Sequence, residues 1–130
     1  MLTRRAFALS LAATSAQLAL PARAADEVPY TPAAFDGARD AGKSIVVVVH
    51  ASWCPTCKAQ KPILAKLEGE EMFKSVVVFH VDFDAQKDAL KRFGVRMQST
   101  LVAFKGATEK ARSVGDTDAN SVSQLFFATL

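Results

Sequence analysis

The chain has two cysteines, Cys54 and Cys57, which lie three residues apart in the segment 53–58, WCPTCK. Residues three apart on a helix share a face, so the two sulfurs can close a small disulfide ring. The free N–H groups and the dipole at a helix start stabilise a thiolate, and Lys58 adds a nearby positive charge. We therefore expect Cys54 to be the attacking thiolate and Cys57, one turn further on, to be the less accessible resolving thiol.

Two other kinds of site could use the same cysteines. One is an inert local disulfide, but a Trp-Cys-x-x-Cys segment between a strand and a helix is typical of exchange-active thiols. The other is a zinc site that adds His50 and His80, which are suitable ligand types. The sequence has no second Cys-x-x-Cys pair and no His-x-x-x-His pair to support such a site. The pattern therefore favours redox chemistry without a bound metal.

The elements around this pair must bring a strand directly to the first cysteine. The run 44–50 holds four consecutive valines, which predicts a strand covered on both faces. A helix over 54–67 follows, with helical spacing of Ile63, Leu64 and Leu67. The other predicted elements are a helix from Thr31 to Gly42, a strand over 75–83, a helix over 85–93, hairpin strands over 100–104 and 110–114, and a helix capped by Asp118. This order predicts one α/β domain.

The first 24 residues have the three parts of a bacterial export signal. Arg4 and Arg5 give a charged start, an apolar stretch over 6–20 follows, and Ala22-Arg23-Ala24 has the small-x-small pattern of a cleavage site. The paired arginines resemble a twin-arginine signal, with an ordinary secretory signal as the alternative. The apolar stretch is short for a membrane span. We expect the signal to be removed, with no stable membrane insertion afterwards.

Removal of this signal changes the charge balance of the protein. The whole chain has a net charge of +3, but the signal contains three arginines and no acidic residue, so 13 basic and 13 acidic side chains remain. A nucleic-acid binder normally has a basic footprint, which is missing here. Half of the residues are apolar and 22% are charged, which excludes a disordered chain. We expect a periplasmic protein with a tether over 25–30 and a domain over 31–130.

From about residue 44 to residue 130, the sequence resembles the thioredoxin superfamily. The resemblance rests on the valine-rich strand that leads into Trp53-Cys54, on Cys57-Lys58 with Pro62 five residues on, and on the segments 81–84 and 93–106. It implies a thioredoxin-like fold, with a central mixed sheet of about four strands flanked by helices. It also implies thiol–disulfide exchange through a mixed disulfide, without a cofactor. The implied partners are protein disulfide or dithiol clients and a redox partner, and we expect a monomer.

Three positions depart from the family's pattern. Val48 stands where thioredoxins have a buried aspartate, and His80 replaces the lysine that pairs with that acid. Ser99 stands at the position of the cis-proline that faces the two sulfurs and helps to hold the substrate backbone. Because a cis bond before a non-proline residue costs about 2.5–4 kcal/mol, we expect the Gln98–Ser99 bond to be trans. We also expect the small serine to leave more open space over the sulfurs than a proline ring does.

Several residues besides the two cysteines are candidates for supporting roles. His80 is either a proton acceptor near Cys57 or a packing residue, and Trp53 either shapes a substrate groove or covers the core. The remaining candidate supporting residues are Pro55, Thr56, Gln98 and Ser99. Since the cis-proline keeps metals off the sulfurs in this family, its absence leaves a competing function, a dithiol module that binds a soft metal of the Cu(I) type with little exchange turnover.

Overall fold

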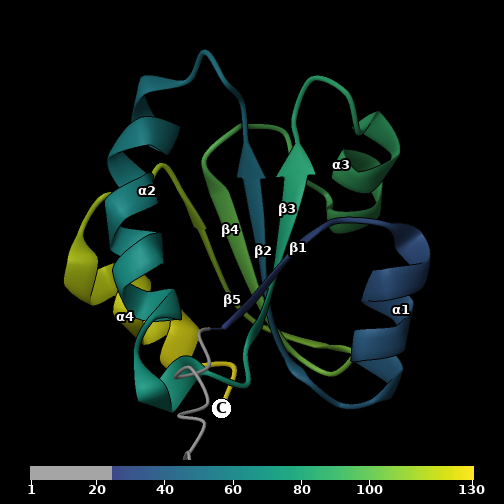
Figure 1. Cartoon of the computed structure of the whole chain (residues 1–130). Coiled ribbons are helices and arrows are strands. Elements are labelled where there is room, and N and C mark those ends of the chain that lie inside the picture. Colours follow the sequence, from purple (N-terminus) through teal and green to yellow (C-terminus); the bar gives the residue numbers. More distant parts are fainter. Residues whose placement is uncertain (1–24) are drawn as a thin grey trace, which may run out of the picture.

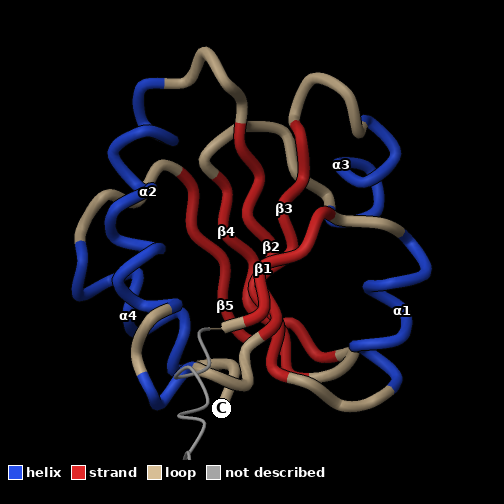
Figure 2. Tube along the Cα trace, viewed as in Figure 1, coloured by secondary structure: helices blue, strands red, loops and turns tan. Residues whose placement is uncertain are grey.

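The computed structural model describes residues 25–130, so the expected export signal lies outside the described residues. Figures 1 and 2 show a twisted sheet with α2 and α4 on one face and α1 and α3 on the other. The five strands have the order β1-β3-β2-β4-β5. In chain order the elements are β1 Asp26–Pro29, α1 Pro32–Asp40, β2 Ser44–His50, α2 Pro55–Glu68, the 3-10 turn η1 Glu71–Phe73, β3 Val77–Asp82, α3 Lys87–Phe93, β4 Thr100–Lys105, β5 Thr108–Val114 and α4 Ala119–Phe127. This arrangement confirms the predicted α/β thioredoxin-like fold.

The central strand β2 pairs with β3 in parallel and with β4 in the antiparallel direction. Its apolar residues alternate between two cores because successive side chains in a strand point to opposite faces. Val47 and Val49 pack in the core beneath α1 and α3, whereas Val46 and Val48 pack in the core beneath α2 and α4. The prediction of a strand covered on both faces is therefore confirmed, and the strand ends directly before the cysteine segment.

The expected tether over 25–30 is wrong, because residues Asp26–Pro29 form the edge strand β1. This strand runs parallel to β3, and the N–H of Tyr30 donates a hydrogen bond to the His80 carbonyl at 2.9 Å. The sheet thus has five strands instead of about four. Four residues that end in proline give no strand pattern, but an edge strand needs partners on one side only and so tolerates proline.

The predicted helix boundaries agree closely with the structure. Thr31 caps α1 through its side chain, and Pro32 occupies the first turn. Asp118 caps α4 in the same way, and Gly94 ends α3 in the left-handed conformation. Within residues 25–130, no helix combines the length and the apolar character needed to span a membrane.

Candidate active site

Cys54 is the residue at which the chain passes from β2 into α2. Its N–H donates to the carbonyl of Ala51 at 3.2 Å, and its Sγ accepts a hydrogen bond from the N–H of Cys57 at 3.1 Å. The sulfur therefore takes the place of the usual N-cap oxygen, and Pro55 fits the first turn because its missing N–H has no partner there. Both cysteines are free thiols in this structure. The predicted placement of the pair at a helix start is confirmed.

Ser99 lies directly over both sulfurs. Its Oγ is 3.1 Å from the Sγ of Cys54 and 3.1 Å from the Sγ of Cys57. No cis peptide bond occurs between residues 25 and 130, so the Gln98–Ser99 bond is trans, as predicted. Ser99 is 2% exposed, and its hydroxyl occupies the position above the thiols.

The backbone of Ser99 is anchored on both sides. Its N–H donates to the carbonyl of Val49 at 2.8 Å, and its carbonyl accepts from the N–H of Gly115 at 3.0 Å. The residue has a φ of 63°, in the left-handed region that non-glycine residues rarely occupy. These contacts with β2 and with the turn after β5 hold the serine in this unusual conformation.

Gln60 is a supporting residue that the sequence analysis missed. Its side chain is buried, and Nε2 donates to the carbonyls of Ser99 at 3.2 Å and Asp116 at 2.9 Å. A signal was present in the sequence: Gln60 lies three residues after Cys57 and four before Leu64, on the buried face of α2. A polar residue at such a position must have a buried partner.

The hydrogen bonds around Cys54 favour its thiolate. Burial acts to raise the pKa of Cys54, but bonds donated by the Cys57 thiol, the Ser99 hydroxyl and the N–H groups of Cys57 and Thr56 outweigh it. The pKa of Cys54 is therefore lowered from the ordinary thiol value of 9.0. Lys58, which we expected to contribute, is exposed and is not among the causes of this shift. Hydrogen bonding at the start of α2 accounts for the lowered pKa of Cys54.

The predicted order of accessibility of the two thiols is wrong. Cys54 has no exposed surface, whereas Cys57 is 8% exposed. The sulfur of Cys54 contacts the Ser99 hydroxyl and the N–H of Cys57 in the first turn of α2. A client sulfur can therefore reach Cys54 only when the segment around Ser99 shifts.

Two exposed side chains, Trp53 and Met97, lie close in the sequence to Cys54 and Ser99, respectively. Trp53 is 55% exposed, and its Nε1 donates to the Oδ2 of Asp84 at 2.8 Å. Its ring also meets the ring of Phe83 edge to face at 6.4 Å between centroids. Met97, two residues before Ser99, is 53% exposed, and Gln98 is partly buried. Trp53 is thus held by Asp84 and Phe83 while more than half of its surface remains exposed.

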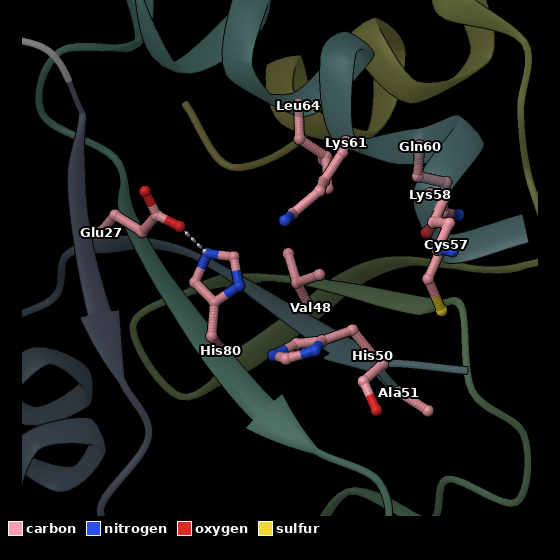
Figure 3. Close-up of a pocket in the computed structure, with 11 residues that line it drawn as sticks. Glu27, Val48, His50, Ala51, Cys57, Lys58, Gln60, Lys61, Leu64 and His80 are labelled. Atoms are coloured by element: carbon pink, nitrogen blue, oxygen red, sulfur yellow. Dashed lines mark ion pairs between the residues drawn. The ribbon is translucent and has the colours of Figure 1, made fainter. Parts of the chain in front are cut away.

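A cavity of about 510 Å³ extends behind Cys57 (Figure 3). Cys57, Val48, His50 and His80 contribute to its lining. Val48 provides no carboxylate at the position where the family has its buried aspartate. Figure 3 shows Cys57 and His80 at opposite ends of the cavity. His80 and Cys57 thus line the same cavity without a direct hydrogen bond between them.

The surroundings of His80 lower the pKa of its imidazole. Burial is the main cause that lowers the pKa of His80, and the neighbouring His50 and Lys61 lower it further. Glu27 acts in the opposite direction, and its Oε1 lies 2.9 Å from the His80 Nε2. A neutral imidazole beside a carboxylate can accept a proton.

The described part of the chain, residues 25–130, contains no group of three or more His, Cys, Asp or Glu side chains placed to hold a metal ion. The two sulfurs and the Ser99 hydroxyl instead form a compact set bonded to one another. This arrangement can carry out thiol–disulfide exchange, in which a thiolate attacks a disulfide sulfur and a second thiol resolves the mixed disulfide.

The comparisons with known proteins agree with this chemistry. The thioredoxin family model matches residues 27–127. A thioredoxin H-type of Fagopyrum esculentum is 36% identical over 62% of this chain and 68% of its own length. A thioredoxin of Chlamydia muridarum is 36% identical over 62% of this chain and 78% of its own length. The crystal structure of Trxlp from Edwardsiella tarda has a TM-score of 0.76 and 39% identity, over 78% of this chain and 98% of its own.

None of these matches supports the alternative of a soft-metal module. They agree instead with the strand-to-helix position of the two thiols and with the Trp-Cys-x-x-Cys pattern. The chain therefore belongs to the thioredoxin family and has, in Cys54 and Cys57, the thiol pair of that family's thiol–disulfide oxidoreductase activity.

Proposed function

We propose that this protein exchanges disulfides with partner proteins outside the cytoplasm, through Cys54 and Cys57. The observation that carries the proposal is the hydrogen-bonded Cys54 sulfur at the start of α2, one turn from a second free thiol. Hydrogen bonds from four donors favour the thiolate there, and the thiolate is the nucleophile in exchange. Both electrons reside on sulfur throughout, so the reaction needs no cofactor.

The reaction proceeds in two substitutions at sulfur. The Cys54 thiolate attacks a client disulfide, forms a mixed disulfide and releases one client thiolate, which takes up a proton. Cys57 then loses its proton and attacks the Sγ of Cys54, which breaks the mixed disulfide and releases the second client thiol. The client gains two electrons, and Cys54 and Cys57 become a disulfide. The same steps in reverse oxidise a client dithiol.

The exposed side chains around the pair support a protein as the client. Trp53 and Met97 are more than half exposed, in the loops that lead into α2 and β4 respectively. The hydrogen bond from Trp53 to Asp84 fixes the indole, so contact with a partner loses little side-chain entropy. Apolar and aromatic side chains are typical anchors of protein contacts.

The proposed location rests on the first 24 residues. The paired arginines, the apolar stretch and the small-x-small ending together support export into the periplasm. An oxidising compartment suits a protein whose only two cysteines form a redox pair. There it would meet disulfide or dithiol clients and a redox partner that restores its starting state.

The proposal is tested by the reduction of insulin disulfides with dithiothreitol as the electron donor. The protein without residues 1–24 should raise the rate of insulin reduction above that with dithiothreitol alone. Cys54→Ser should return the rate to this background, because it removes the nucleophile. Ser113→Ala is a matched control that removes a hydroxyl on β5 with no hydrogen bond to either thiol, and it should retain the full rate. An unmodified protein that gives only the background rate would contradict the proposal.

A further inference from the structure

The Ser99 hydroxyl is shared by the two thiols but has a single proton. Its Oγ lies 3.1 Å from both sulfurs, so it can donate to one of them and must accept from the other. This restriction fixes the direction of the bonds once one sulfur has lost its proton.

In the thiolate form of the pair, the Ser99 proton has one possible direction. A Cys54 thiolate can only accept, so the Ser99 O–H donates to it, together with the N–H of Cys57. The Cys57 thiol retains its proton, which it can donate to the Ser99 Oγ or directly to the Cys54 thiolate. In the first case, a chain of hydrogen bonds runs from Cys57 through Ser99 to Cys54 and ends on a charge. Hydrogen bonds to a charged acceptor are about twice as strong as neutral ones.

Ser99 is held for this contact before any charge develops. Val49 and Gly115 fix its backbone, and Gln60 donates a further bond to its carbonyl. Ser99 is buried, so water competes little with its hydroxyl for the sulfur. A preorganised donor in a water-excluded site stabilises charge without reorganisation.

The stabilisation acts on one redox state only. In the disulfide, both sulfurs are neutral, weak acceptors without an S–H proton. Neither the hydrogen bond from Ser99 to a thiolate nor the hydrogen bond from the Cys57 S–H can then form. We propose that the Ser99 hydroxyl stabilises the dithiol over the disulfide, raises the reduction potential of the pair and so favours oxidation of client dithiols. This inference rests on the proposed function and assigns a direction to it.

The favoured reaction balances between the protein and its client. One client thiolate attacks Cys54 in the disulfide form, and the Cys57 sulfur leaves and takes up a proton. The second client thiolate then attacks the client sulfur of the mixed disulfide, and Cys54 leaves as the thiolate that Ser99 stabilises. The client loses two electrons to the Cys54–Cys57 pair and gains a disulfide. A more stable leaving thiolate favours both this step and the final equilibrium.

Ser99→Gly tests the inference because glycine accepts the left-handed backbone and removes only the side chain. The measurement is the equilibrium constant with reduced and oxidised glutathione. We expect Ser99→Gly to favour the disulfide about tenfold more than the unmodified protein, which corresponds to a potential lower by about 30 mV. Titration of the thiolate by its ultraviolet absorbance should give a higher pKa for Cys54. Ser99→Ala, a second variant without the hydroxyl, should shift both values in the same direction.

Ser113→Gly provides the matched control, since Ser113 also has a buried hydroxyl, for which residues 25–130 offer no hydrogen-bond partner. Its equilibrium constant should equal that of the unmodified protein. Folded Ser99→Gly and Ser99→Ala proteins with an unchanged constant would overturn the role of Ser99, even if the unmodified protein reduces insulin. If the unmodified protein neither equilibrates with glutathione nor reduces insulin, the proposed function itself fails.

Discussion

Replacing Gln60 by leucine should destabilise the protein by about 2–3 kcal/mol. The buried Nε2 donates to the carbonyls of Ser99 and Asp116, and leucine has a similar size but no donor. Each lost hydrogen bond costs about 1 kcal/mol. Ser99 keeps its bond from Gly115, whereas no other donor to the Asp116 carbonyl is present among the described contacts, so a further cost of about 1 kcal/mol is expected there.

Urea unfolding of the reduced protein without residues 1–24 measures this loss. The urea concentration at the midpoint of unfolding should fall, while the slope of the free energy of unfolding against urea concentration stays the same. In a domain of about 100 residues, this loss lowers the melting temperature by about 10 °C or more. Gln124→Leu is the matched control, because it makes the same chemical change at an exposed position of α4 and should alter stability by less than about 0.5 kcal/mol. A Gln60→Leu protein as stable as this control would refute the structural role assigned to Gln60.

Two further predictions concern a buried carboxyl group and the export signal. Burial, and secondly the charge of Glu27, raise the pKa of Glu68 from 4.5 to about 7. The folded protein therefore binds this proton more tightly than the unfolded chain, and the free energy of unfolding should fall as the pH rises from about 4.5 to about 7. Glu68→Gln should remove up to about 3 kcal/mol of this fall in urea unfolding, and an equal fall in both proteins would contradict the assignment. Replacing Arg4 and Arg5 together by lysine should block export by the twin-arginine route in cell fractionation, whereas normal export with a first residue Ala25 would indicate the ordinary secretory route.

The main elements of the fold were predictable because their signals are local. The valines of 44–50 predicted the doubly covered strand β2, and the caps Thr31 and Asp118 predicted two helix starts. The strand β1 was missed for a physical reason. Its four residues are ordered by hydrogen bonds to β3, about fifty residues away, and not by any pattern of their own.

The candidate site was predictable in its thiols but not in what surrounds them. The spacing of Cys54 and Cys57 and the strand before them placed the pair at a helix start, as the structure confirms. The contact of Ser99 with both sulfurs depends on its bond to Val49 on the neighbouring strand, which is a long-range interaction. The burial of Cys54 beneath Ser99 follows from the same contact, so the prediction of a more accessible Cys54 was wrong.

The most direct test of thiol–disulfide exchange is capture of the mixed disulfide. The reduced Cys57→Ser protein, mixed with a disulfide-bonded protein such as insulin, should accumulate a covalent adduct that mass spectrometry locates on Cys54, because no resolving thiol remains. Cys54→Ser should give little adduct, since the hydrogen bonds that favour the thiolate converge on Cys54. Equal trapping in the two variants, or an adduct on neither, would contradict the roles assigned to the two cysteines.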